Sequence, residues 1–217
     1  MQRHDELPRL LPVALRLDGR RCLVVGGGRV AARKAADLLA CGADVTVVAL
    51  EVRSAMARLE AEHERLEVRV RAYRAEDLDG MAVVMAATGV QEVDVAVAGD
   101  ARGRGTLVNS ADDPERCDFY LTSVHRSGPV TVSVSSSGAS PALARWLRAR
   151  LAHEVGPEFA SVAHLLWECR STLQAQGIAT EGLDWDSLLD GPLVAMVRDG
   201  RLADARATIE QWLEAAT

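Results

Sequence analysis

The chain has 217 residues, enough for one sizeable domain with a smaller appendage. Its formal net charge of −6, with no long run of one sign, excludes the global basic surface that is typical of nucleic-acid binding. Its 48% hydrophobic content is ordinary for a globular protein, and no uninterrupted apolar stretch approaches the roughly 20 residues that span a bilayer.

The N-terminus and the cysteines indicate the compartment. Residues 1–15 carry acidic side chains and no long apolar core, so we expect no signal peptide. The four cysteines, at positions 22, 41, 117 and 169, are scattered singly and form neither a disulfide framework nor a zinc pattern. We therefore expect a soluble cytoplasmic protein with no membrane or nucleic-acid partner.

Residues 21–110 alternate between short apolar runs and helical segments. The first helical segment places Val30, Lys34, Leu38 and Cys41 along one side, and Gly42 follows as its C-cap. Strand and helix alternating at this spacing predict βαβ units and a parallel, Rossmann-type α/β sheet with helices on its faces. The predicted strands are 22–25, 45–49, 66–70, 82–87 and 106–108, and the predicted helices are 29–41, 51–63 and 90–102.

The pattern changes beyond residue 112. Two further strands are predicted at 119–124 and 130–134, joined by the polar stretch 125–129, and the second alternates apolar and polar residues. Ser140 and Pro141 then predict the N-cap and first position of a helix. After about residue 157 the chain is predicted to be helical, with apolar stripes at helical spacing and a last helix at about 201–215.

Residues 26–31 read Gly-Gly-Gly-Arg-Val-Ala and fit the dinucleotide-binding pattern G-x-G-x-x-G/A between a predicted strand and a predicted helix. Gly26 permits the tight turn, and Gly28 removes the Cβ that would block a pyrophosphate. Gly27, Arg29 and Val30 complete the loop, whose backbone N–H groups at the helix start would face the phosphates. The alternative is a turn that only needs positive φ angles.

The end of the second strand bears on the choice of cofactor. The acidic residue that would hold the ribose hydroxyls is absent at Ala49-Leu50, and the nearest candidate is Glu51. No arginine stands at that strand end to favour the 2′-phosphate of NADP, so NAD is the expected cofactor. Thr88, at the end of the fourth strand, is the remaining candidate for cofactor binding.

Four segments together resemble the precorrin-2 dehydrogenase family, which includes the N-terminal module of sirohaem synthase. They are VVGGGRVAARKAADLLACGADVTVVA, AATG, VNSADDPERCDF and VSSSGASPALARWLR, within the first 155 residues; the helical tail matches only in type. The resemblance implies NAD-dependent oxidation of precorrin-2 to sirohydrochlorin in sirohaem biosynthesis by a homodimer. Some family members also insert iron. The five histidines show no paired ligand spacing, so we expect no metal site of the protein's own, and the sequence leaves chelatase activity open.

The resemblance also assigns site residues. It places the catalytic carboxylate on Asp112 and a serine of the substrate pocket on Ser136. The position of Asp112, two residues past the last predicted parallel strand, agrees with a proton acceptor in the crevice where open α/β sheets bind ligands. Asp113, before Pro114, is explained as a helix N-cap. The alternative is that both aspartates only shape the turn.

A tetrapyrrole substrate with eight carboxylates would need small polar groups and guanidinium groups. The stretch Ser136-Ser137-Gly138 leads into a helix N-terminus, and Arg145 and Arg126 are the arginine candidates for the propionate and acetate groups. The alternative is an ordinary loop with a Ser140 N-cap and solvated arginines.

Two positions depart from the family pattern, and two other functions remain open. Gly89-Val90 replaces acidic residues, and Ser137 stands where the family has glycine. A regulatory module that senses NAD without catalysis is the main alternative, which turnover would exclude. A small-carbonyl reductase is disfavoured because neither tyrosine has a lysine at suitable spacing. We expect an NAD-binding domain at 1–112, a dimerisation and substrate region at 113–155 and a helical region at 156–217, with no methyltransferase domain following.

Overall fold

The structure is a computed structural model that describes residues 7–216. Residues 1–6, part of the segment in which no signal peptide was expected, lie outside this range. The chain forms two compact units, the first ending at Leu121 and the second beginning at Thr122. Each unit is described by itself below.

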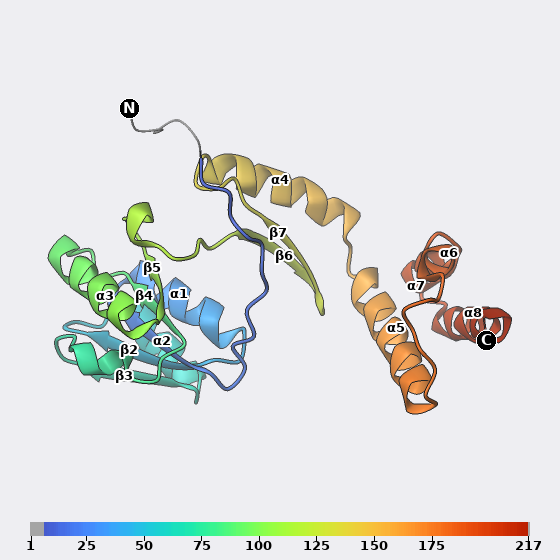
Figure 1. Ribbon diagram of the computed structural model, residues 1–217, viewed down its shortest axis with the longest axis horizontal. Coiled ribbons are helices and arrows are strands. Elements are labelled where there is room, and N and C mark those ends of the chain that lie inside the picture. The colour runs from blue at the N-terminus through green and yellow to red at the C-terminus, as the bar shows by residue number, and fades with distance from the viewer. Residues whose placement is uncertain (1–6, 217) are drawn as a thin grey trace. The chain divides into compact units, whose positions relative to one another are not determined.

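The first unit is a five-stranded parallel sheet in the order β3-β2-β1-β4-β5 (Figure 1). This is the strand order of the Rossmann fold, which confirms the predicted fold class. The strands are β1 (Arg21–Val25), β2 (Asp44–Ala49), β3 (Leu66–Val70), β4 (Val83–Ala86) and β5 (Leu107–Ser110). The helices are α1 (Arg29–Leu39), α2 (Ser54–Glu62) and α3 (Gln91–Arg104), with short 3₁₀ turns at Ala75–Leu78 and Pro114–Arg116.

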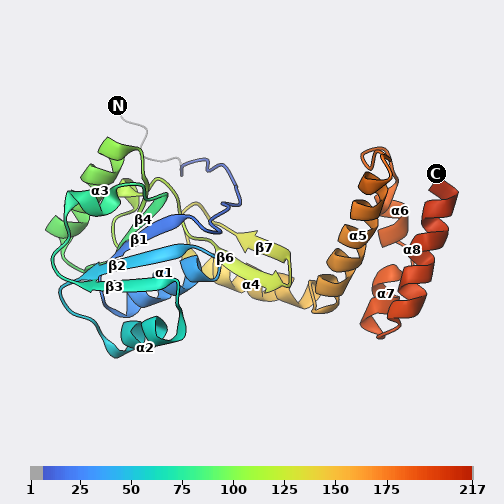
Figure 2. The ribbon, with the colours of Figure 1, turned by 90° about the horizontal axis from the view of Figure 1, so that it is seen from below.

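Helices cover both faces of this sheet, with α1 and α2 on one face and α3 on the other (Figure 2). Successive residues of β1 therefore enter different cores: Val24 packs in the core under α1 and α2, and Leu23 in the core under α3. Because both faces are buried, the central strands β1, β2 and β4 are nearly continuous apolar runs, which made them visible in the sequence.

The C-terminus of α1 confirms the predicted role of Gly42. Gly42 has φ +77° and its N–H donates to Leu39 O at 2.9 Å, while Ala43 N–H donates to Leu38 O at 3.2 Å. This pair of hydrogen bonds ends the helix in a Schellman motif, whose left-handed position favours glycine.

The second unit begins with an antiparallel hairpin of β6 (Ser123–Ser127) and β7 (Val130–Val134), followed by α4 (Pro141–Glu154), which packs against both strands. Helices α5 (Glu158–Ala175), α6 (Trp185–Leu189), α7 (Leu193–Arg198) and α8 (Leu202–Ala216) form a bundle around their own apolar core (Figure 1). The Trp185 and Trp212 rings contact each other in this bundle, with centroids 4.9 Å apart and planes tilted by 39°. The predicted helical tail is thus confirmed.

The first strand of the hairpin differs from its prediction. It was expected at 119–124, but β6 begins at Ser123 and continues through Ser127, which pairs with Val130. The turn is therefore the two residues Gly128-Pro129, and Gly128 adopts φ +55°. The stretch before Ser123 is instead bound to β5, since Phe119 O accepts a hydrogen bond from Asn109 Nδ2 at 2.9 Å.

Candidate dinucleotide site and its surroundings

The candidate site lies at the carboxyl ends of the parallel strands. The strand order reverses between β1 and β4, and open α/β sheets bind ligands beyond the carboxyl ends of the strands at such a switch point. The loop after β1 is Gly26-Gly27-Gly28, and the loop after β4 contains Thr88. The loop after β5, the neighbouring strand, carries Asp112. The topology therefore brings the predicted cofactor loop and the predicted proton acceptor to one edge of one sheet.

Two of the three glycines are required by close backbone approach. A Cβ on Gly26, which has φ +129°, would collide with the Ala87 carbonyl at the end of β4. A Cβ on Gly27 would collide with the Glu51 carbonyl and lie 3.0 Å from Ala49 Cβ. These glycines let the loop pass between the ends of β2 and β4.

Gly28 has a different environment, because a Cβ built there meets no heavy atom within 4 Å. It is the N-cap of α1, and no side chain of the described residues caps this helix end by a hydrogen bond. An uncapped helix N-terminus beside open space suits a phosphate, whose oxygens would accept from the first backbone N–H groups. The residues present therefore fit a dinucleotide pyrophosphate.

The segment that follows β2 carries one acidic side chain, Glu51, and one basic side chain, Arg53. Glu51 is exposed and its carbonyl lies against Gly27. Arg53, also exposed, donates its backbone N–H to Gly27 O at 3.0 Å and is the N-cap residue of α2. Arg53 was not a candidate from the sequence, because the helix was expected to begin at residue 51, whereas α2 begins at Ser54.

Thr88 shapes the loop after β4. Its hydroxyl donates to Asp94 Oδ1 at 2.8 Å, its backbone N–H reaches the same oxygen at 3.2 Å, and Val90 N–H donates to the hydroxyl at 3.0 Å. These hydrogen bonds tie the end of β4 to the first turn of α3. The side chain of Thr88 thus supports the loop that forms one wall of the crevice.

Asp112 is exposed, two residues beyond the end of β5. The segment that carries it returns to the same strand, because Asp118 exchanges two hydrogen bonds with the Val108 backbone, at 2.8 and 2.9 Å. The Cys117 sulfur, in turn, accepts from Ser110 N–H at 3.2 Å. Asp112 therefore projects from a segment that is fastened to β5 on both sides.

The capping role expected for Asp113 is wrong in its detail. Asp113 is the N-cap residue of the turn at Pro114–Arg116, but its carboxylate makes no capping hydrogen bond. It forms an ion pair with Arg116 Nε at 2.7 Å instead. One turn of 3₁₀ helix offers few free N–H groups, and the guanidinium three residues later is the stronger partner.

A buried polar bridge that was not predicted from the sequence joins α1 to β5. Lys34, on α1, has only 5% of its surface exposed, and its Nζ donates to Asn109 Oδ1 at 2.6 Å. Burial is the main cause that lowers the pKa of Lys34, partly opposed by the neighbouring Cys117 thiol. The available signal was a lysine within the otherwise apolar stripe of the predicted helix.

The predicted substrate segment lies in the second unit as a tight turn between β7 and α4. Ser136 Oγ donates to Ser140 O and accepts from Ser140 N–H, both at 3.0 Å. Ser140 Oγ accepts from Leu143 N–H at 3.2 Å, which confirms it as the N-cap of α4. Ser137 has φ +52° and Gly138 φ +86°, so both occupy the left-handed region.

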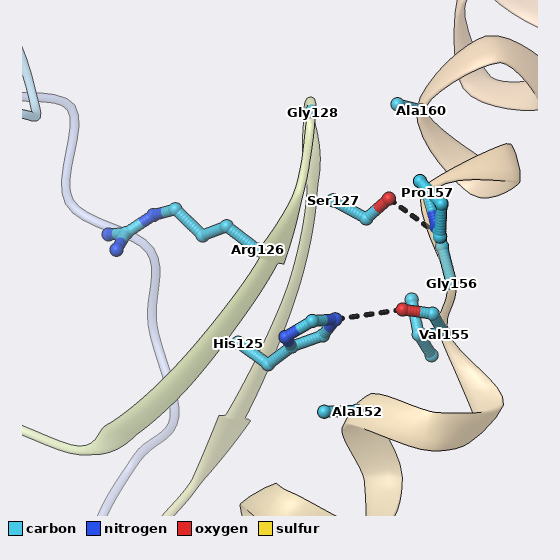
Figure 3. Close-up of a pocket in the computed structure, with 9 residues that line it drawn as sticks. All are labelled: His125, Arg126, Ser127, Gly128, Ala152, Val155, Gly156, Pro157 and Ala160. Atoms are coloured by element: carbon cyan, nitrogen blue, oxygen red, sulfur yellow. Dashed lines mark hydrogen bonds between the residues drawn. The ribbon is translucent and has the colours of Figure 1, made fainter.

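The candidate arginines of this unit are exposed on separate elements: Arg126 on β6 and Arg145 on α4. Arg126 points away from a cavity of about 350 Å³ between the hairpin and the α4–α5 turn (Figure 3). The polar side chains in that cavity bind backbone: His125 Nε2 lies 2.8 Å from Val155 O, and Ser127 Oγ donates to Gly156 O at 2.7 Å. These two hydrogen bonds hold the hairpin against the α4–α5 turn, so the polar side chains of the cavity serve the packing of this unit.

The described residues include neither a cluster suited to a metal ion nor a helix suited to a membrane. Residues 7–216 contain no group of three or more His, Cys, Asp or Glu side chains placed to hold a metal ion. Within the same range no helix is long and apolar enough to cross a membrane.

The fold and the glycine loop define a dinucleotide-binding protein of the Rossmann class, and comparisons with known proteins agree. A family described as "Putative NAD(P)-binding" matches residues 13–123, and "Sirohaem biosynthesis protein central" matches residues 127–154. The chain belongs to the precorrin-2 dehydrogenase family, as its sequence segments indicated.

Individual relatives show the extent of the similarity. The siroheme synthase of Chromobacterium violaceum is 40% identical over 94% of this chain, and that of Methylococcus capsulatus is 36% identical over 95%. The chain spans 44% of the length of each of these two relatives. The solved structure of SirC, a precorrin-2 dehydrogenase, is similar with a TM-score of 0.73 at 27% identity, over 94% of this chain and 100% of SirC.

Proposed function

We propose that the protein oxidises precorrin-2 to sirohydrochlorin with NAD as the hydride acceptor, as a step of sirohaem biosynthesis. The observation that carries the proposal is the position of Asp112 at the same sheet edge as the Gly26–Gly28 loop, in a chain of which 94% is similar to a precorrin-2 dehydrogenase. A module that only senses NAD would need no carboxylate there.

The reaction removes a hydride and a proton from the reduced tetrapyrrole. When bound, NAD accepts the hydride and becomes NADH. The Asp112 carboxylate accepts the proton and later passes it to water, for which its exposed position is suited. Gly26, Gly27 and Gly28, with the N–H groups of Arg29 and Val30, hold the pyrophosphate.

Two further residues support this assignment of the cofactor. The Glu51 carboxylate binds the ribose hydroxyls and would repel the 2′-phosphate of NADP. The loop held by Thr88 forms the wall beside the nicotinamide, since it follows β4 on the other side of the switch point from the glycine loop.

The substrate carboxylates are recognised by the second unit. The turn Ser136-Ser137-Gly138 presents backbone at the start of α4, and Arg126 and Arg145 supply exposed guanidinium groups. Because Ser136 Oγ is bound to the Ser140 backbone, its part is to hold the turn in shape for the substrate.

The protein acts as a cytoplasmic homodimer. Helix α4 carries exposed apolar side chains at helical spacing, namely Leu143, Trp146, Leu147 and Leu151, with Trp146 56% exposed. An exposed apolar stripe of this kind is typical of an interface, and a second copy of the chain is the proposed partner. All four cysteines are free, as suits a reducing compartment.

The test is anaerobic incubation of the protein with enzymatically made precorrin-2 and NAD, following sirohydrochlorin and NADH by their absorption. We expect turnover by the wild type and a loss of about 10²- to 10⁴-fold in Asp112→Asn, with NAD affinity retained. Glu115→Gln is the matched control, because Glu115 is an exposed carboxylate of the same segment, and it should stay near wild-type activity.

Two outcomes would contradict the proposal. NAD binding without any NADH production by the wild type would support the sensing module instead. Full activity of Asp112→Asn would leave the reaction in place and remove Asp112 from it.

A further inference from the structure

The chain contains a single lysine, Lys34, although Lys and Arg together number 25. This lysine is buried on α1, between one and two turns after the cofactor loop. Its partner is the Asn109 side chain, 75 residues away in the sequence, on β5. A methionine would fill a similar volume without removing a charge from water, so packing alone does not explain an amine here.

The lysine determines how the Asn109 amide is oriented. An ammonium only donates hydrogen bonds, so the amide oxygen must face Nζ and the amide nitrogen must face away. Asn109 Nδ2 accordingly donates to Phe119 O at 2.9 Å and lies 3.5 Å from Cys117 Sγ. The bridge from α1 therefore reaches both ends of the segment that carries Asp112: Asn109 precedes it on β5, and Phe119 follows it.

Cys117 continues the connection towards Asp112. Its thiol donates to Ser110 O at 3.2 Å or to Asp113 O at 3.4 Å, and it accepts from Ser110 N–H. Ser110 and Asp113 flank Asp112 in the sequence. A displacement of the Asn109 amide would thus be transmitted to the backbone on either side of the carboxylate.

We propose that Lys34 is a positioning residue of the dehydrogenase: through Asn109 its buried ammonium fastens the helix that starts at the cofactor loop to the segment that holds Asp112. This inference rests on the proposed function. Burial is the largest cause that lowers the pKa of Lys34; Arg33 adds to this shift, and Cys117, Asp37 and Asp112 oppose it.

The first test needs no activity. Protein labelled with [¹³Cε]-lysine has one lysine signal, which can be titrated without assignment. The signal should titrate below pH ~10.4, the value of an ordinary lysine, and Asn109→Leu should lower its midpoint further, because the lost acceptor favoured the charged form. A midpoint unchanged in Asn109→Leu, or a lysine already neutral at pH 7, would overturn the proposal.

The second test measures catalysis in Lys34→Met, Asn109→Leu and the double variant. Each single variant should lower kcat by about tenfold to a hundredfold with NAD affinity nearly unchanged, and the double variant should be no worse than the worse single one. Arg33→Met is the matched control, since it removes a positive charge from the neighbouring, exposed position of α1. Additive losses, or an equal loss in Arg33→Met, would overturn the proposal.

Lys34→Arg separates a positional role from simple packing. If the charge is needed, wild-type kcat falls at alkaline pH as Lys34 loses its proton, and Lys34→Arg removes this fall while retaining part of the activity. An alkaline fall that persists in Lys34→Arg would belong to another group and overturn the proposal. If the wild type has no turnover at all, the proposed function fails, while the lysine titration still decides whether the bridge exists.

Discussion

Ser137 occupies a backbone conformation that costs a non-glycine residue free energy. Its φ of +52° is the only positive φ of a non-glycine residue among those that the structure describes. The conformation is imposed by the turn, in which Ala139 N–H donates to Ser136 O at 2.9 Å and Ser137 N–H donates to Ser135 Oγ at 3.1 Å. The strained conformation agrees with the glycine that the family resemblance led us to expect at this position.

Ser137→Gly should therefore stabilise the protein by about 1 kcal/mol, because glycine adopts this conformation without strain. The free energy of unfolding of wild type and variant would be measured by chemical denaturation, followed by the loss of helical signal. Ala139→Gly is the control in the same turn: Ala139 has no positive φ, so glycine there should destabilise by increasing the entropy of the unfolded chain. A Ser137→Gly variant less stable than the wild type would refute the strain.

The burial of Lys34 makes folding stability depend on pH at the alkaline side. Burial lowers the pKa of Lys34 in the folded state, so over the range between this value and its ordinary value the unfolded chain binds more protons. Stability should thus rise as the pH increases through that range. At lower pH both states are protonated and the folded state carries the full cost of the buried charge.

Comparing urea denaturation of wild type and Lys34→Met from pH 7 to 10 would measure this contribution. We expect the wild type to gain stability relative to Lys34→Met as the pH rises. Arg33→Met should show no such trend relative to the wild type, because a guanidinium keeps its proton throughout this range. A constant difference between wild type and Lys34→Met would mean that the lysine is not desolvated.

The glycine loop and the start of α1 act together as one element. Gly27 is pressed against the Glu51 carbonyl, whereas Gly28 faces open space. Alanine at these adjacent positions should therefore affect different properties: the stability of the fold at Gly27, and the affinity for NAD at Gly28.

Gly27→Ala should destabilise the fold by a few kcal/mol, because its Cβ meets backbone that cannot give way. Gly28→Ala should leave stability nearly unchanged but weaken NAD binding by about tenfold or more, because its Cβ enters the space of the pyrophosphate. Thermal unfolding and calorimetric titration with NAD would separate the two. Unchanged affinity in Gly28→Ala would contradict the placement of the pyrophosphate.

At the scale of the whole molecule, α4 is the surface that the proposed dimer needs. Trp146→Glu would place a charge in the apolar stripe and should shift the protein from dimer to monomer in light scattering coupled to size exclusion. Trp167→Glu is the control on α5, where a tryptophan that is still more exposed (68% against 56%) lies outside this stripe. A dimer that survives Trp146→Glu but dissociates in Trp167→Glu would move the interface to the helical bundle.

The sequence by itself determined the elements of the first unit and the candidate site's main residues. Buried parallel strands are continuous apolar runs, the glycine loop is a local pattern between strand and helix, and Asp112 follows a strand end directly. Ser140 and Gly42 were likewise predicted because helix caps depend on neighbours only a few residues away. All of these signals are local in the chain.

Only the tertiary structure decided which distant residues meet. Lys34 contacts Asn109 because the order β1-β4-β5 puts the strand after α3 within reach of α1, and no local pattern contains that order. The start of β6 was misplaced for the same reason: Asp118 and Phe119, which were expected at the start of this strand or just before it, bind β5 instead. Side-chain partners 10 to 75 residues apart are chosen by the packing of the folded chain, where a buried polar group must find its hydrogen bond.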